Sequence, residues 1–323
     1  EASFPDLSPA PPARDAGLRE LIEQAIAKLE EKGRPVPEGL RAILSHPPTL
    51  EIPKEPPDLP PPTPAPPAPP PPESLEETLI RKGSLAGRDL TGADLSGRDL
   101  GGMDFRRAVL ARANLSGCQL DGTDFTGARL AGADLRKCDM RRVLLRSADL
   151  AGARLGESDL TGGDLTDADF EKADLENAKL LSVSAPGASF LAARLVGADL
   201  RKARLEKANF AEAVLHRADF SESILTLASF LRSWGRAATF VKADAREVRM
   251  IEARFPGGDF SEIRAPRSVW EKSHLPGGKF PRAGLERAEF SSALLHRANF
   301  TQANLRTARL VEASLRGADL TRA

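Results

Sequence analysis

The feature that most constrains the fold is an apolar residue at every fifth position from Leu85 to Leu320, with no insertion. Of the 48 positions in this series, 44 hold Leu, Phe, Met or Trp, and the exceptions are Ala185, Gly235, Ala245 and Ala265. A small residue usually stands two positions earlier, and Asp or Asn often stands one position earlier. A strict short period indicates a repeat architecture. Because a period of five matches neither a helix nor a flat strand, we expect an all-β solenoid of short strands and corners.

Segments such as 93–97 (ADLSG) and 133–135 (ADL) resemble the motif of the pentapeptide-repeat family. The resemblance implies a right-handed quadrilateral parallel β-helix with four units per coil, so residues 84–323 would form about twelve 20-residue coils. Residues 20 apart would then lie in one row, and most Phe residues fall into two of the rows. Cys118 and Cys138 share a row, and we expect adjacent buried thiols that stay reduced, because strand spacing is too wide for a disulfide.

The chain before the repeats is organised differently. Residues 1–46 include a predicted amphipathic helix over about 15–33, and residues 47–72 are a linker in which 15 of 26 residues are Pro. Such a segment favours an extended, semi-rigid spacer. The capping box of Ser74 and Glu77 predicts a helix within residues 73–83. This helix would cover the first coil, as the ends of stacked repeats require.

Charge and composition limit the function classes. Residues 1–80 hold 7 Lys and Arg against 14 Asp and Glu, whereas residues 81–323 hold 39 against 32. Two Cys in a chain of this length favour a reducing compartment, so we expect a cytoplasmic location, with a secreted or secretion-associated location as the alternative. The family resemblance implies a bacterial source. No apolar run is long enough to cross a membrane. The four His form no ligand-spaced cluster, and no nucleophile or phosphate-loop motif is present. We therefore expect no enzyme activity, no catalytic residues, no metal and no cofactor.

The most distinctive stretch is 231–285, which holds both Trp residues and three of the four exceptions to the apolar series. At a spacing of 20, Trp234 falls in one row with aliphatic and basic residues, and this row is a candidate protein-docking patch: Val214, Trp234, Arg254, His274 and Leu294. An outward Trp flanked by aliphatic residues is typical of a docking surface. The alternative is a local shift in register that turns Trp234 inward to fill the gap beside Gly235.

Basic residues crowd the early repeats and form a candidate basic patch: Arg106, Arg107, Arg136, Lys137, Arg141, Arg142 and Arg146. Such a patch could bind nucleic acid or anionic lipid. Interleaved acidic residues and the lack of surface aromatics make nucleic acid a poor candidate partner.

The sequence favours a non-enzymatic scaffold that presents the faces of a rigid rod to protein partners. The resemblance implies one alternative, a DNA-mimic regulator of gyrase or another topoisomerase, which would need an acidic rod. Repeats behind a Pro-rich linker are also similar to accessory proteins of the bacterial type VI secretion system. A start at Glu1 rather than Met fits a piece of such a protein.

The core of the last coil, Leu305 to Leu320, would be uncovered, so we expect a homodimer through this end unless the natural chain continues.

Overall fold

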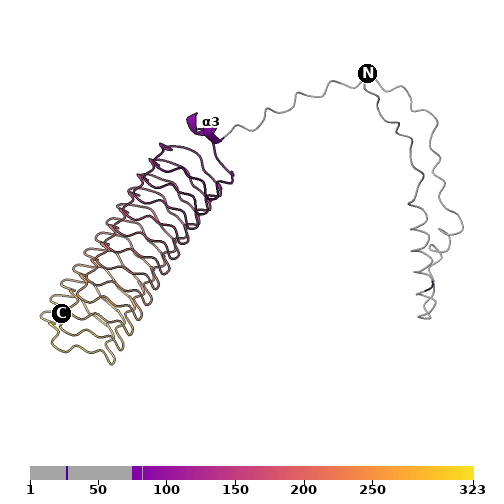
Figure 1. The fold of residues 1–323 in the computed structure, drawn as a ribbon. Helices are drawn as coiled ribbons and strands as arrows, with labels where there is room; N and C mark the ends of the chain where they lie inside the picture. Colours follow the sequence, from indigo (N-terminus) through magenta and orange to yellow (C-terminus); the bar gives the residue numbers. More distant parts are fainter. Residues whose placement is uncertain (1–26, 28–74, 82) are drawn as a thin grey trace, which may run out of the picture. The chain divides into compact units, whose positions relative to one another are not determined.

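The computed structural model describes Ala27, residues 75–81 and residues 83–323. The chain divides into two units, Glu1–Pro71 and Pro72–Ala323. In the first unit only Ala27 is described, and it is helical. The rest of the helix predicted over 15–33 and the linker predicted over 47–72 lie outside the described residues. The second unit contains helix α3 (Leu75–Ile80), followed by a rod of stacked coils (Figure 1).

The rod repeats one five-residue conformation. In most units two corner residues are followed by a buried and usually small residue, a residue that bridges to the next coil, and a buried apolar residue. The bridges are parallel and join residues 20 apart, from Asp89 and Val109 to Asn299 and Asp319, so no strand is longer than one bridging residue. At one bridge, the Leu95 N–H donates to the Asn114 carbonyl at 2.8 Å. Four units therefore make one coil with four faces.

The Asp and Asn residues of the motif stabilise the corners. The Asp94 carboxylate accepts a hydrogen bond from the Ser96 backbone N–H at 3.1 Å, and the same contact recurs two residues after many bridging Asp and Asn residues. Hydrogen bonds from Ser96 hold the pKa of Asp94 below its ordinary value. Short polar side chains that bond the backbone two residues on favour turns. The repeated Asp is thus a structural residue of the corner.

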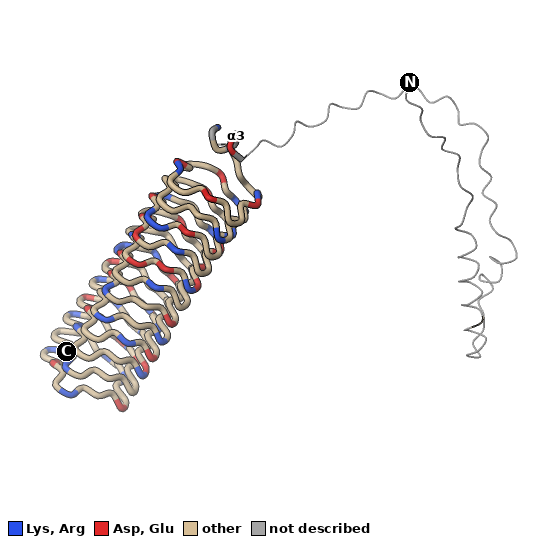
Figure 2. The backbone as a smooth tube through the Cα atoms, viewed as in Figure 1, with Lys and Arg blue, Asp and Glu red and all other residues tan. Residues whose placement is uncertain are grey.

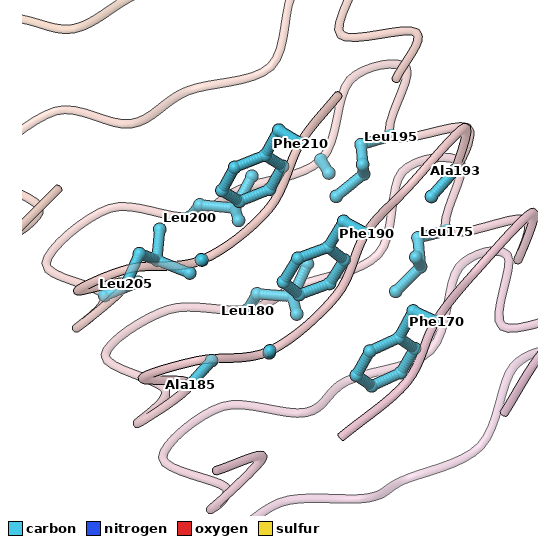
Figure 3. Packing of buried hydrophobic residues seen from close by; sticks show 14 of the residues in the cluster. Phe170, Leu175, Leu180, Ala185, Phe190, Ala193, Leu195, Leu200, Leu205 and Phe210 are labelled. Carbon is cyan, nitrogen blue, oxygen red and sulfur yellow. The ribbon is translucent and has the colours of Figure 1, made fainter. Parts of the chain in front are cut away.

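Rows of stacked rings fill much of the interior. Phe170, Phe190 and Phe210 stack on successive coils, with centroid distances of 5.0 and 4.8 Å and interplanar angles of 5° and 1° (Figure 3). A second row runs from Phe220 to Phe300 and meets the first row edge to face, as at Phe220 and Phe230, where the rings stand at 83°. Stacked and edge-to-face pairs each add about 0.5–1.5 kcal/mol beyond the burial of their area.

Three Phe residues of the rod lie outside these two rows. Phe105 and Phe125 stack at 5.0 Å in a third row, and Phe255 lies in the fourth row. The expectation that Phe forms two rows is therefore correct only for the long runs of Phe in successive coils. The largest inward side chain, Trp270, is fully buried, and its indole N–H donates to the Ser268 hydroxyl at 2.7 Å. A buried Trp needs such a partner for its one polar group.

The two cysteines lie within the core. Cys118 and Cys138 are buried and unbonded to each other, and each thiol contacts a backbone carbonyl of the preceding coil at 3.0 Å. Burial raises the pKa of Cys138 to about 12. Both residues occupy the small inward position, as expected from their spacing, and both thiols are protonated at neutral pH.

Helix α3 contributes to the first coil. The Leu79 side chain is 8% exposed and belongs to the core. The Glu76 carboxylate accepts two hydrogen bonds from the Arg98 guanidinium, both at 3.1 Å. Acidic and basic residues are interspersed along the rod (Figure 2). None of the described helices has the length and apolar character that a membrane span requires.

Candidate protein-docking face

The five residues of the candidate docking patch lie in one row on one face of the rod. Parallel bridges join each to the next across successive coils, in the order Val214, Trp234, Arg254, His274 and Leu294. We call this row, with the corner residues on either side of it, the Trp234 face. A row of bridging residues points outward because the buried small and apolar residues on either side of each one point inward. The structure thus brings together residues that span 80 positions of the sequence.

Trp234 points outward, and its side chain is 52% exposed. The ladder is regular here, since the Trp234 N–H donates to the Ala213 carbonyl at 2.9 Å. The space beside Gly235 is filled by another residue, because a Cβ at Gly235 would lie 2.1 Å from Cε1 of the Phe255 ring. The alternative of an inward Trp234 is therefore wrong. Phe255 takes up the missing volume, and the register does not shift.

A histidine supports the exposed indole. The His216 ring stands edge-on to Trp234, with centroids 5.8 Å apart and an interplanar angle of 80°. His216 Nδ1 accepts a hydrogen bond from the Arg236 backbone N–H at 3.0 Å, which requires that Nδ1 carry no proton. Burial lowers the pKa of His216, and the charge of Arg236 lowers it further. The imidazole beside Trp234 is thus neutral at pH 7 and adds to the weakly polar surface around the indole.

One exposed leucine, Leu231, extends this surface at the adjoining corner, whereas a second, Leu227, lies one face away; the sequence interpretation missed both. Leu227 is 45% exposed and Leu231 is 36% exposed, and they occupy corners of the same coil as Trp234. Leu227 has a φ of 62°, and it is the one large apolar side chain among the described residues with positive φ. That conformation costs an L-residue about 1 kcal/mol relative to glycine. Corner positions mostly hold polar residues or glycine. The presence of leucine at two of them was the sequence signal that could have revealed these exposed side chains.

Charged residues border the indole. Arg232, Trp234, Glu252, Arg254 and Lys272 line an open groove of about 510 Å³. Arg232 pairs with Glu252 at 2.9 Å, and this contact lowers the pKa of the Glu252 carboxyl. Lys272 pairs with the neighbouring Glu271 at 3.3 Å. Arg254 makes no ion pair with any described carboxylate, although its charge helps, as a lesser cause, to lower the pKa of Glu252.

The far end of the row is separate from this apolar surface. Leu294 is 41% exposed, but Arg254 and His274 stand between it and Trp234. The apolar part of the Trp234 face is therefore centred on Val214, Trp234 and the adjoining corner.

The residues of the candidate basic patch occupy three different corners of the rod rather than one face. Arg106 pairs with Asp104 at 2.8 Å, and Arg136 pairs with Asp134 at 2.5 Å. The other ion pairs join Lys137 to Glu157, Arg141 to Asp139, Arg142 to Asp121 and Arg146 to Asp164. Of the seven, Arg107 alone has no described carboxylate partner. The local charge is thus largely balanced by the acidic residues of the ladder.

Two further features bear on the predicted partners. In the last coil, Leu305, Leu310 and Leu315 are partly exposed and Leu320 is 41% exposed. The homodimer through this end stays a prediction.

Within the described part of the chain, no group of three His, Cys, Asp or Glu is arranged to hold a metal ion.

The comparisons with known proteins agree with the architecture. The family model described as pentapeptide repeats matches this chain in 8 copies. Together the matches cover more than half of the chain, over residues 89–127, 123–162, 145–180, 158–200, 193–230 and 285–323. The stretch between the last two matches contains Trp234 and Gly235, yet its coils are as regular as the others. No curated protein matches the chain.

Solved structures of repeat proteins resemble the chain at low identity. HetL, a pentapeptide repeat protein involved in heterocyst differentiation regulation from the cyanobacterium Nostoc sp. strain PCC 7120, is 24% identical over 73% of this chain and 86% of its own, with a TM-score of 0.23. QnrB1, a plasmid-mediated fluoroquinolone resistance protein, is 19% identical over 73% of this chain and 91% of its own, with a TM-score of 0.34. A pentapeptide repeat protein of the Arabidopsis thaliana thylakoid lumen is 26% identical over 29% of this chain and 62% of its own, with a TM-score of 0.23.

The family assignment rests on the repeated sequence match and on the uniform 20-residue ladder of parallel bridges. Four units per coil, inward apolar rows and Asp-bonded corners follow from the same motif. The chain belongs to the pentapeptide-repeat family and forms its right-handed quadrilateral β-helix.

Proposed function

We propose that this protein is a non-enzymatic scaffold that binds a protein partner through the Trp234 face. The observation that carries the proposal is the 52% exposure of Trp234 within a regular ladder, next to Leu231 and Val214. Trp is enriched among the residues that contribute most binding energy in protein interfaces. An exposed apolar cluster bordered by charged residues is typical of an interaction surface.

The rod supports such a role because it holds the patch in a fixed shape. About twelve coils, each bonded to the next, would present Trp234 at a constant position, and a preformed surface loses little entropy on binding. The predicted helical segment and Pro-rich linker at the N-terminus would join this surface to a second element. Many polar side chains of the rod form hydrogen bonds or ion pairs with other residues of the rod. Asp94 bonds a corner, for example, and the Ser233 hydroxyl donates to the Phe230 carbonyl at 2.8 Å.

The DNA-mimic alternative is less favoured on electrostatic grounds. A mimic of duplex DNA needs a strongly acidic surface, because its target is built to neutralise phosphates. Residues 81–323 hold 39 Lys and Arg against 32 Asp and Glu. Many of the acidic side chains are also paired, as Asp199 is with Arg201 at 2.7 Å. The type VI association and the cytoplasmic location stay predictions.

A photo-crosslinking experiment tests the proposal in the producing cell. The photoreactive amino acid benzoylphenylalanine would replace one outward bridging residue of the same coil at a time: Ile224, Ser229, Trp234 or Thr239. Because these four residues lie on the four faces of one coil, each variant is a control for the others. We expect a discrete adduct at position 234, competed away by the unmodified protein and not by a folded Trp234→Ala variant. Equal adducts on all four faces, or none, would contradict a docking role for this face.

A further inference from the structure

A row of aliphatic side chains runs along the corner beside Trp234. Leu191, Ala211, Leu231 and Ile251 occupy the same corner position in successive coils. Backbone hydrogen bonds fix this stacking, for example from the Glu212 N–H to the Leu231 carbonyl at 2.8 Å and from the Arg232 N–H to the Ile251 carbonyl at 2.9 Å. We call these four residues the aliphatic corner row. It lies parallel to the axis of the rod, and Trp234 stands beside it on the next face.

The backbone of these coils has no free edge. The Trp234 N–H donates to Ala213 at 2.9 Å, and the Trp234 carbonyl accepts from the Leu215 N–H at 2.7 Å. A partner therefore cannot add a strand here, because strand addition needs unpaired N–H and C=O groups. An extended partner segment laid over aliphatic side chains would leave its own backbone groups without hydrogen bonds, which is unfavourable. A helix satisfies its backbone internally and binds through side chains alone.

The spacing of the rod also suits a helix. Successive coils are separated by about 4.8 Å, the distance between neighbouring strands. One turn of an α-helix rises about 5.4 Å. A helix lying along the axis can therefore place one apolar side chain per turn, at i, i+3/4 and i+7, against successive members of the aliphatic corner row. Over three coils the two spacings differ by less than about 2 Å in total.

The charges beside the row define the polar side of such a helix. The coil of residues 224–243 contains Arg232, Arg236 and Lys242 and no Asp or Glu. In the next coil Arg249 and Arg254 are exposed on the two faces that flank the corner row, and neither forms an ion pair with a described carboxylate. The acidic residue at the corner between them, Glu252, is paired with Arg232 of the coil before. Cations on both sides of an apolar row complement a helix whose apolar stripe is bordered by Glu or Asp.

From these observations we infer that the partner segment is an acidic amphipathic α-helix, which lies along the aliphatic corner row and packs its apolar stripe against Leu231, Ile251 and Trp234. This inference rests on the proposed docking function and names its partner chemistry. The acidic residues of the helix pair with Arg249 and Arg254.

The test uses the full chain and synthetic peptides of about 18 residues, five helical turns. The first peptide carries Leu at i, i+3/4 and i+7 with Glu on both sides of the stripe. The second has the same composition with the stripe scrambled, the third replaces the flanking Glu by Lys, and the fourth contains central Pro residues that prevent a helix. Binding is measured by fluorescence anisotropy of a labelled peptide. The emission of Trp234 provides a second signal, because covering an exposed indole shifts its emission to shorter wavelength.

We expect the first peptide to bind and each of the others to bind at least about tenfold more weakly. Trp234→Ala and Arg254→Glu should each weaken the first peptide by about tenfold or more, whereas Ile224→Ala on another face of the same coil should have no effect. Arg254→Glu should in turn strengthen binding of the Lys-flanked peptide, an effect that general loss of structure cannot produce.

Equal binding of the Pro-containing peptide would overturn the requirement for a helix, and equal binding of the Lys-flanked peptide would overturn the charge assignment. If no peptide binds while crosslinking at position 234 still yields a discrete adduct, the helix inference is wrong and the docking function stands. If both experiments fail, the docking function itself is wrong. Concentration-dependent self-association that Trp234→Ala abolishes would instead identify a second copy of this chain as the occupant.

Discussion

The ring of Phe255 fills the space that Gly235 leaves in the coil before it. A Cβ on Gly235 would lie 2.1 Å from Cε1 and 2.4 Å from Cδ1 of that ring. The two residues occupy the same row, in which Leu is the usual side chain, so one large and one minimal side chain replace a pair of leucines. Their complementarity keeps the ladder in register and leaves Trp234 on the surface.

This pairing predicts a rescue. Gly235→Leu should destabilise the rod by about 1–3 kcal/mol, because the new side chain would overlap the Phe255 ring in a closely packed core. Adding Phe255→Leu should restore much of the loss by recreating the leucine pair of the other coils. The midpoint of urea unfolding measures both effects. A double variant no more stable than Gly235→Leu alone would show that the two volumes are not coupled.

The two tryptophans should behave in opposite ways. Trp234→Ala removes a side chain that is 52% exposed, so we expect the free energy of unfolding to change by less than about 0.5 kcal/mol. Trp270→Ala removes a fully buried side chain and leaves Ser268 without its donor, so we expect a loss of about 3–5 kcal/mol. Chemical denaturation measures both, and a large loss for Trp234→Ala would mean that the indole contributes to packing.

Both thiols should resist modification while the protein is folded. Cys118 and Cys138 are buried, and burial raises the pKa of Cys138 to about 12. Because the thiolate is the reactive form, a disulfide reagent at pH 8 should label neither residue in the folded protein. The same reagent should label both in denaturant. Rapid labelling of one thiol without denaturant would indicate that the early coils open locally.

The bridging aspartates make stability depend on pH. Hydrogen bonds from Arg136, Arg141 and Arg201 lower the pKa values of Asp134, Asp139 and Asp199 in the folded state. A carboxyl whose folded pKa is below its unfolded value, about 3.9, stabilises the fold above that value. This stabilisation is lost as the pH falls through the folded pKa. The unfolding midpoint should therefore be steady from about pH 7 to 5 and fall below about pH 4.

One variant checks the source of this effect. Asp199→Asn keeps an oxygen that can accept the Arg201 backbone N–H, seen at 3.1 Å, but removes the charge that pairs with the guanidinium. It should lower the midpoint at pH 7 slightly and make the fall in acid shallower. A midpoint that rises on acidification would contradict the role assigned to these carboxylates.

The period of the sequence predicts most of the fold because each unit is local and identical in plan. It also predicts that Val214, Trp234 and Arg254 share a row, since residues 20 apart must do so in a four-sided coil. It does not predict how Phe255 leans toward Gly235, because that depends on side-chain volumes in two coils together. The ion pair between Arg142 and Asp121 likewise crosses coils at a corner, where side-chain rotamers and not the repeat decide which charges meet.

Because the ladder is strict, the number of residues that precede a position determines on which side of the rod that position lies. Each unit of five turns the chain by one face, and 20 residues return it to the same row one coil further on. An insertion of five residues upstream of Trp234 would therefore carry the indole to an adjacent side of the rod and leave its local packing nearly unchanged. Duplication of 20 residues would move it along the axis alone. Insertion or deletion of whole five-residue units can thus rotate a binding surface about the rod axis by quarter turns, without any substitution in the surface itself.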